Sequence, residues 1–461
     1  MQNKSRNVLQ IILTALVALI ILSICPWSEW TGGRLKDFNL LGDITVEAPA
    51  AAASAACNID PELAQLTTEQ LQDTVAQPEE VVEAEILAPI PNDFEAPQKD
   101  GVILFEDYST DNSGLASLKS KLAEADRRKV RIAMVGDSYI EGDILAQDLR
   151  SGLQDIYGGV GVGYVGAFSQ FPGFRQSVRQ TSNGWDEYEI RKMKRDSLRT
   201  ILGHYHVATE LPNIRFRGSS KPANADAWEN TSIIFLAPSD GEIKISNGNG
   251  DEQTFQVQSS SELQQVSLNA YSADVKITSS IVGLKVLGIW LEGDQGIVLD
   301  DISLRGNSGV SHRYLNHSTT HALRQWIDYD IIILEFGMNA LSEGQTDYSA
   351  YGKGMVEVIN NLKSLYPNAD IIMMGVGDRA VKRGTDFITM PSLHAMIASQ
   401  REAARTTESI FYDTQAAMGG DGAAVDWHKR RLLNSDYVHL NHKGGKALAE
   451  IIIESLSTSL P

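Results

Sequence analysis

The stretch Val130–Ser138 reads Val-Arg-Ile-Ala-Met-Val-Gly-Asp-Ser, an apolar run that ends in a glycine and two polar residues. An apolar run of this length with a single charge predicts a strand buried on both faces of a sheet. Tyr329–Phe336 (YDIIILEF) and Asp370–Val376 (DIIMMGV) have the same character. Val102–Tyr108 (VILFEDY) predicts one more strand ahead of them.

Helical patterns lie between these strands. Leu115–Ala125 and Met355–Tyr366 have apolar residues at helical spacing. A third helix is expected directly after Ser138, because apolar residues recur at helical intervals from Ile144 to Ile156. Strands that alternate with helices predict an α/β fold, in which helices cover both faces of a parallel sheet to give three layers.

The middle of the chain has a different hydrophobic pattern. Short alternating stretches fill residues 182–298, for example SIIFLA at 232–237 and GEIKISN at 241–247. Polar turn signals such as Asn247-Gly248-Asn249-Gly250 separate them. The pattern predicts an antiparallel β-sandwich inserted into the α/β domain.

Ser138 is the first candidate for chemistry. It follows a buried strand at the carboxyl edge of the predicted sheet, where open α/β folds bind their ligands. Backbone N–H groups there can stabilise a developing oxyanion. A serine hydroxyl is a weak nucleophile until a base removes its proton, so a histidine is needed as its partner.

His439 is the best candidate for this base. Asp436 lies three residues earlier, so one turn can bring its carboxylate to the imidazole, where it would fix the tautomer and stabilise the imidazolium. His428 and His442 are nearby competitors, but neither has an acid three residues upstream. Asn339, in Gly337-Met338-Asn339 after the strand Tyr329–Phe336, could donate its amide to the same oxyanion or only shape a turn.

Taken together, these motifs resemble the SGNH (GDSL-like) hydrolase superfamily in content and order. Gly-Asp-Ser comes first, Gly-x-Asn follows a middle strand, and Asp-x-x-His lies near the end. The resemblance covers residues 130–170 and 300–455, and it implies the three-layer α/β/α fold of that superfamily. It also implies Ser138 as nucleophile, Asp436 and His439 as the rest of a catalytic triad, and Asn339 as an oxyanion donor.

The superfamily uses a further glycine N–H in its oxyanion hole, beside the N–H of the nucleophile. By resemblance this glycine is Gly306, in the segment after the insert, with Gly309 as the competitor. Ala340 follows Gly-x-Asn where many members have Asp. This departure concerns the subgroup and removes no catalytic group.

A finer resemblance involves the block that begins GDSYIEGDILAQDLR and continues into a Gly-rich segment ending at Val165. It is similar to the nucleophile block of peptidoglycan O-acetylesterases, which also carry an inserted β-sandwich that is similar to carbohydrate-binding modules. The resemblance implies an O-acylated cell-envelope glycan as substrate. Trp185, Trp228 and Trp290 of the insert could stack on sugar faces or pack in its core, the latter being favoured for Trp290.

Three functions remain open from the sequence. The first is an esterase that removes O-acyl groups, most simply O-acetyl, from an envelope polysaccharide or peptidoglycan. The second is an O-acetyltransferase that uses the same triad and works with a membrane acyltransferase. The third is a glycan-binding protein without catalysis, which the set of Ser138, Asn339, Asp436 and His439 argues against.

The N-terminal segment predicts a membrane anchor. Val8–Cys25 is uncharged, and at about 1.5 Å per residue its length of about 27 Å approaches the thickness of the bilayer hydrocarbon. Lys4 and Arg6 precede it, which favours a cytoplasmic N-terminus. A cleaved signal peptide is the alternative. The expected location is therefore the inner membrane, crossed once, with the catalytic domain in the periplasm or otherwise outside the cytoplasm.

The expected domains follow in order along the chain. They are an anchor at 1–30, a low-complexity tether at 31–100, a first hydrolase part at 101–181, the inserted sandwich at 182–298 and a second hydrolase part at 299–461.

Composition excludes several partners and cofactors. The formal net charge of −19 argues against nucleic acid, whose phosphates require a basic surface. Two cysteines, Cys25 and Cys57, offer no metal-ligand spacing. No phosphate-binding glycine loop occurs, so neither a cofactor nor a metal is expected.

Overall fold

The strand β4 (Lys129–Gly136) lies inside the sheet that carries the candidate serine, as the apolar run at residue 130 predicts. A computed structural model describes residues 95–192 and 196–461, which all belong to one compact unit. Every residue of β4 after Lys129 is buried. Parallel neighbours flank the strand on both sides, β14 on one and β15 on the other.

The sheet is six-stranded and mixed, whereas the sequence predicted a parallel sheet. Five strands run parallel and the last is an antiparallel edge, in the order β14 (Gly296–Ser303), β4, β15 (Ile331–Glu335), β16 (Asp370–Met374), β19 (Ile410–Tyr412) and β3 (Glu106–Asp107).

The predicted single strand Val102–Tyr108 is wrong. It is divided between β2 (Val102–Ile103), which pairs with β1 (Gln98–Lys99), and the edge strand β3. The break has a physical cause, because the backbone between the two strands bonds elsewhere. The N–H of Leu104 donates to the carbonyl of Pro97, and the N–H of Phe105 donates to Ser459 Oγ.

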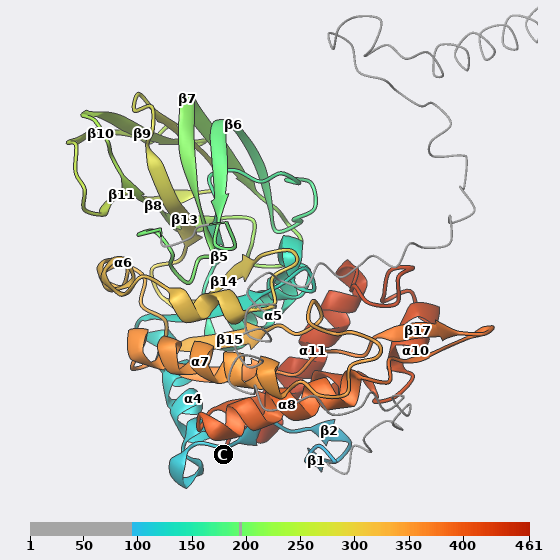
Figure 1. Cartoon of the computed structure of the whole chain (residues 1–461). Coiled ribbons are helices and arrows are strands. Elements are labelled where there is room, and N and C mark those ends of the chain that lie inside the picture. Colours follow the sequence, from blue (N-terminus) through green and yellow to red (C-terminus); the bar gives the residue numbers. More distant parts are fainter. Residues whose placement is uncertain (1–94, 193–195) are drawn as a thin grey trace, which may run out of the picture. The chain divides into compact units, whose positions relative to one another are not determined.

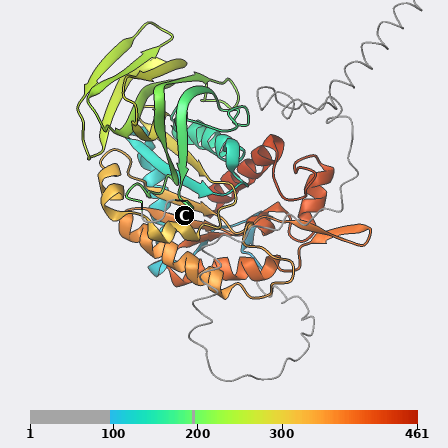
Figure 2. The ribbon, with the colours of Figure 1, turned by 45° about the horizontal axis from the view of Figure 1, so that its top comes forward.

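Helices cover both faces of this sheet. Figures 1 and 2 show α5 and α11 on one face and α7 and α8 on the other, and within each pair the helices pack against each other. The helices are α4 (Gly114–Ala123), α5 (Ala146–Tyr157), α6 (His317–Leu323), α7 (Ser349–Leu365), α8 (Leu393–Thr406), α9 (Thr414–Met418), α10 (Ala423–Lys429) and α11 (His442–Ser459). The hairpin β17 (Ala380–Arg383) and β18 (Asp386–Thr389) lies between β16 and α8 in the sequence.

The middle of the chain forms a nine-stranded antiparallel sheet (Figure 1). Its strands are β5 (Gly161–Val165), β6 (Val178–Glu189), β7 (His204–Gly218), β8 (Trp228–Leu236), β9 (Gly241–Asn247), β10 (Glu252–Val257), β11 (Gln264–Ser272), β12 (Asp274–Ser279) and β13 (Lys285–Glu292). One end of β7 pairs with β13 and the other end pairs with β12. The strand therefore connects two halves of the sheet, one formed by β9, β10 and β12 and the other by β8, β11 and β13. Side chains of both halves share one hydrophobic core.

The expected insert limits, 182 and 298, fall inside strands. β6 already begins at Val178, and β5 joins the nine-stranded sheet through β13. At the other end, β14 begins at Gly296 and belongs to the six-stranded sheet.

Buried polar contacts join the two sheets. Asp300 on β14 accepts hydrogen bonds from the backbone N–H of Tyr164 (2.8 Å), from Trp290 Nε1 (2.9 Å) and from the hydroxyl of Tyr329 (2.9 Å). Arg131 on β4 makes a two-pronged ion pair with Glu292 at the end of β13, with both N–O distances 2.7 Å. This ion pair therefore links β13 of the nine-stranded sheet to β4, the strand that precedes the candidate serine.

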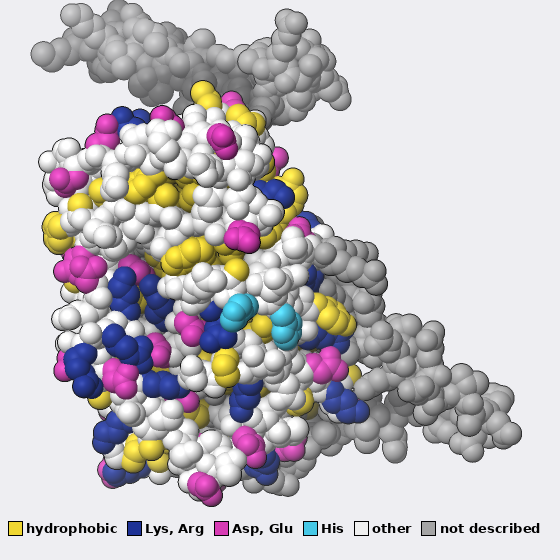
Figure 3. All heavy atoms as spheres, turned by 90° about the vertical axis from the view of Figure 1, so that its left-hand side faces the viewer, with side chains coloured by type: hydrophobic (Ala, Val, Ile, Leu, Met, Phe, Trp, Pro, Cys, Tyr) yellow, Lys and Arg dark blue, Asp and Glu magenta, His cyan; other side chains and the backbone are white. Residues whose placement is uncertain are grey.

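The predicted anchor Val8–Cys25 and most of the tether lie outside the described residues. Among residues 95–192 and 196–461, no helix combines the length and the apolar character needed to cross a bilayer. On the face drawn in Figure 3, Lys and Arg side chains are interspersed with Asp and Glu, so the negative net charge is not gathered into one acidic surface there.

Candidate active site

The loops that follow three neighbouring strands carry the candidate residues. Ser138 follows β4, Asn339 follows β15, and the segment with Gly306 follows β14. Because these strands run parallel and adjacent, their carboxyl ends bring the three loops to the same edge of the sheet.

Ser138 lies in a tight turn rather than at the start of a helix, which corrects the expectation from the sequence. The 3₁₀ segment Glu141–Asp143 follows this turn, and α5 begins only at Ala146. Gly142 (φ 73°) and Asp143 (φ 67°) are left-handed and interrupt a continuous helix. The carboxylate of Asp143 holds this conformation, because it is buried in a two-pronged ion pair with Arg150 on α5 (2.9 and 2.7 Å).

The Asp436–His439 segment is a short loop with its own internal hydrogen bonds. The N–H of Tyr437 donates to the carbonyl of Asn434, and the N–H of Asn434 donates to the carbonyl of His439. Asp436 Oδ1 accepts the backbone N–H groups of Val438 and His439, both at 3.0 Å. The loop therefore presents the carboxylate and the imidazole in a fixed relation.

The structure brings the three residues expected as a triad into hydrogen-bond contact. Ser138 Oγ lies 3.0 Å from His439 Nε2, and His439 Nδ1 lies 2.7 Å from Asp436 Oδ2. Burial would raise the pKa of Asp436, but its hydrogen bonds with His439 and two backbone N–H groups outweigh this and lower it to about 2. The same hydrogen bond raises the pKa of His439 above its usual 6.5. The arrangement suits an imidazole that takes a proton from Ser138.

The helix α11 holds the histidine loop against the serine turn. Asn441 caps this helix through its side-chain oxygen, which accepts the N–H groups of Lys443 (3.0 Å) and Gly444 (3.1 Å). Gly445 faces the backbone of the serine segment so closely that a Cβ there would lie 1.9 Å from the carbonyl oxygen of Ile144. Only glycine permits this approach of the two backbones.

The two competing histidines have other partners. His442 Nδ1 lies 3.3 Å from Gln147 Nε2, and His428 Nδ1 lies 3.1 Å from the carbonyl of Asn434. Neither of them contacts Ser138 Oγ through a hydrogen bond, whereas His439 does.

Asn339 is tied into a network that the sequence analysis missed. Its Nδ2 donates to Asp137 Oδ2 (2.8 Å) and to the carbonyl of Asn307 (3.1 Å). Asp137 is fully buried and also accepts the backbone N–H of Tyr139 (2.9 Å), and burial raises its pKa to about 7. The middle residue of Gly-Asp-Ser therefore positions the asparagine amide next to the serine turn. Its place inside the motif was the signal for this role.

The two candidate glycines differ in their hydrogen bonds. The N–H of Gly309 donates to Asn307 Oδ1 (2.9 Å) and is occupied inside its own loop. The N–H of Gly306 donates to no acceptor in the described part of the chain, and its carbonyl accepts a hydrogen bond from Arg191 Nη1 (3.3 Å). This difference favours Gly306 over Gly309, as proposed from the resemblance.

The tryptophans of the insert do not form a sugar-binding surface. Trp228 and Trp290 are fully buried and Trp185 is 9% exposed, so all three pack in the interior.

Comparison with known proteins adds the fold relationship. No protein-family model matches the chain, and no curated protein sequence matches it. A solved structure described as a peptidoglycan O-acetylesterase in action matches with a TM-score of 0.64 and 22% identity, over 77% of this chain and 99% of that one.

Two other matches have much lower TM-scores, so no argument rests on them. One is a GDSL-like lipase from Parabacteroides merdae (TM-score 0.27, 18% identity, 35% of this chain and 73% of that one). The other is a family two carbohydrate esterase from Cellvibrio japonicus (TM-score 0.26, 9% identity, 61% of this chain and 99% of that one). By its sheet order, by the loops that carry its site and by its likeness to the O-acetylesterase structure, the chain has the SGNH hydrolase fold.

Proposed function

We propose that the protein is a serine esterase that removes O-acyl groups, most simply O-acetyl, from a cell-envelope glycan. The observation that carries the proposal is the chain of contacts from Ser138 Oγ to His439 (3.0 Å) and from His439 to Asp436 (2.7 Å). These side chains come from two loops about three hundred residues apart in sequence. The three groups fulfil the nucleophile, base and orienting roles of a serine hydrolase.

The reaction begins when His439 Nε2 takes the proton of Ser138 as its Oγ attacks the ester carbonyl. Asp436 stabilises the imidazolium that forms. The N–H groups of Ser138 and Gly306 and the amide of Asn339 stabilise the oxyanion, each contributing about 3–4 kcal/mol of barrier lowering. His439 then gives this proton to the sugar oxygen as the ester C–O bond breaks, so that the sugar leaves with a free hydroxyl. Water, deprotonated by His439, attacks the acyl-enzyme, and the proton returns to Ser138 Oγ as the carboxylic acid leaves.

Asn339 can join the oxyanion hole only by exchanging one partner. Its two amide hydrogens point to Asp137 and to the carbonyl of Asn307. An oxyanion, being charged, is a stronger acceptor than the neutral carbonyl of Asn307. We expect the amide to keep Asp137 and to exchange Asn307 for the oxyanion.

Aromatic side chains near the site support a glycan substrate. Tyr437, next to Asp436, stacks on Phe387 with ring centroids 4.1 Å apart, and Phe387 is 36% exposed. Phe171 is 52% exposed, and its ring packs against the guanidinium of Arg305, a residue of the loop after β14. Sugar rings present C–H faces that pack on exposed aromatic rings. The peptidoglycan substrate named for the matching structure supports the same class of substrate.

We place this activity outside the cytoplasm, anchored by Val8–Cys25. The proposal rests on the uncharged run and on the basic residues before it. N-terminal sequencing of the mature protein tests it, since a chain that begins at Cys25 or later has no anchor.

Acetate release from defined O-acetylated glycans tests the reaction. Ser138→Ala should lower it by at least about 10³-fold with an unchanged circular dichroism spectrum. The control is Ser342→Ala, an exposed serine in the loop after β15 that should keep full activity. A fully active Ser138→Ala variant would refute the assignment. Labelled acetyl that appears on an added glycan acceptor rather than in free acetate would identify a transferase instead.

A further inference from the structure

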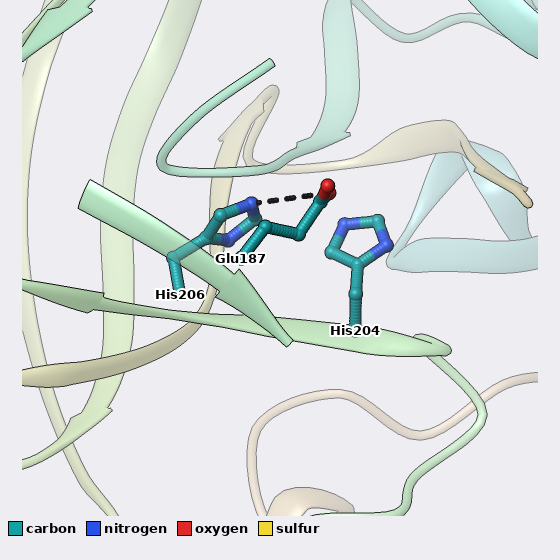
Figure 4. A group of neighbouring side chains, drawn as sticks. All are labelled: Glu187, His204 and His206. Carbon is teal, nitrogen blue, oxygen red and sulfur yellow. Dashed lines mark ion pairs between the residues drawn. The ribbon is translucent and has the colours of Figure 1, made fainter. Parts of the chain in front are cut away.

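A cluster of potential metal ligands lies in the nine-stranded sheet, outside the catalytic residues. Glu187 on β6 pairs directly with His206 on β7, and His204 lies two residues earlier on the same strand. Residues two apart on a strand point to the same face. Figure 4 shows the carboxylate of Glu187 lying between the two imidazole rings.

His206 is buried and His204 is half-buried, and both imidazoles have buried nitrogens without a hydrogen-bond partner among the described residues. His206 has no exposed surface, and neither of its ring nitrogens has a hydrogen-bond partner among the described residues. His204 Nε2 is 2.8 Å from the hydroxyl of Tyr164, but its Nδ1 is buried without a partner. An unsatisfied buried polar atom costs about 1–3 kcal/mol, so three of them together require an explanation.

An ion pair between Glu187 and His206 does not explain these unsatisfied nitrogens. Glu187 Oε1 lies 3.6 Å from His206 Nε2, beyond hydrogen-bond distance, and the pair would leave His206 Nδ1 and His204 Nδ1 unsatisfied.

The spacing of the three groups suits a small cation. One ligand atom from each of the three side chains lies within 4.8 Å of the others. Ligands of a tetrahedral zinc ion with bonds of about 2.0 Å are about 3.3 Å apart. The distance of 3.6 Å between Glu187 Oε1 and His206 Nε2 is near this value, and the ligand atom of His204 lies within 4.8 Å of both partners.

We propose that Glu187, His204 and His206 bind a zinc ion through one carboxylate and two imidazoles. This ligand set suits zinc better than calcium or magnesium, which prefer oxygen ligands. Glu187 is exposed, which leaves a path for the ion and a position for water. None of the three residues belongs to the proposed triad or to the proposed oxyanion hole, so the proposal does not rest on the esterase function.

The zinc ion would have a structural role. The ring of Phe168 lies 6.5 Å from that of His206, and Gln180 Nε2 donates to the carbonyl of Gly166 (2.9 Å). The segment after β5 therefore packs against the metal-binding face of β6 and β7. Zinc would cross-link β6 and β7 and so stabilise the position of the segment after β5.

The experiment uses the full chain, stripped of metal with a chelator and then titrated with zinc chloride by calorimetry. We expect one tight site per chain and a melting temperature that rises with zinc. Glu187→Gln, a conservative change at an exposed side chain, should weaken zinc binding at least about 10-fold and abolish most of the thermal shift. His204→Gln should do the same.

Two control variants distinguish this site from other histidines. His321→Gln, at an exposed residue of α6, should leave zinc binding unchanged. His439→Gln should also retain the tight site, although it removes the proposed catalytic base. The proposal is overturned if the wild type binds no zinc tightly, or if Glu187→Gln and His204→Gln, each folded by circular dichroism, bind zinc as tightly as the wild type. It is also overturned if His439→Gln removes the tight site.

Discussion

The contact between Asp436 and His439 determines when the imidazole can act as a base. A base must be neutral to accept a proton, and the hydrogen bond from Asp436 raises the pKa of His439 above 6.5. Activity should therefore rise with pH through a pKa above 6.5 and be lost below it. The pKa of Asp436, lowered to about 2, keeps its carboxylate charged throughout that range.

Asp436→Asn should remove both effects of this carboxylate. We expect kcat to fall on the order of 10⁴-fold, as is typical when this member of a triad loses its charge. The pKa of His439 should also fall, because its largest raising contribution is gone, so the acidic limb of the kcat/KM profile should move to lower pH. The pH dependence of kcat/KM, measured for the wild type and for Asp436→Asn, tests this shift. Asp426→Asn, a change at an exposed residue, is the control. An acidic limb at an unchanged pH would contradict the assignment.

At the scale of elements, α11 sets the distance between the histidine loop and the serine turn. Gly445→Ala would place a methyl group 1.9 Å from the carbonyl oxygen of Ile144, so the helix must move away. Overpacking of this kind costs about 1–3 kcal/mol. We expect kcat to fall at least about 10-fold, because Ser138 and His439 separate.

Unfolding in denaturant and steady-state kinetics on the same sample test this change. Lys446→Ala is the matched control, since it alters the next, exposed residue of the same helix without a clash. Wild-type activity in Gly445→Ala would show that the close backbone approach does not position the histidine.

Elements with a simple hydrophobic pattern were predictable from the sequence. The apolar runs around residues 130, 332 and 372 are the strands β4, β15 and β16, because short apolar runs rich in β-branched residues between helical segments favour strands buried on both faces of a sheet. The contact between Asp436 and His439 could also be expected from their spacing of three, since both residues lie on one turn; their catalytic roles stay a prediction.

Elements that depend on distant partners were not predictable. The left-handed Asp143, which delays α5, is held by Arg150 and by Ser177, thirty-four residues away. The role of Asp137 depends on Asn339, about two hundred residues later in the sequence. The zinc ligands depend on the pairing of β6 with β7, although His204 and His206 at a spacing of two were a visible signal.

For the whole molecule, the ion pair between Arg131 and Glu292 links the two sheets. Both residues are buried, and Arg131 lowers the pKa of Glu292 although burial acts in the opposite direction. A carboxyl group with a lowered pKa stabilises the fold above its unfolded pKa, and this contribution is lost as the pH falls through the folded value.

Arg131→Met should destabilise the protein by about 3–5 kcal/mol near pH 7, because it leaves a buried carboxylate with Lys129 as its remaining charged partner. The double variant Arg131→Met/Glu292→Leu should recover most of this loss. Denaturant unfolding measures both, and the deficit of the single variant should narrow in acid as Glu292 is protonated. A single variant as stable as the wild type would show that the ion pair does not hold the sheets together.

The position of β14 also has a consequence for the order of events during synthesis. β4 is complete at Gly136, but its two neighbours, β14 and β15, begin only at Gly296 and Ile331. All nine strands of the other sheet emerge from the ribosome in this interval and have their partners among themselves. We expect the nine-stranded sheet to reach its native pairing first, while β4 still lacks its neighbours β14 and β15. During this interval β4 would be an unpaired apolar segment that a chaperone could bind.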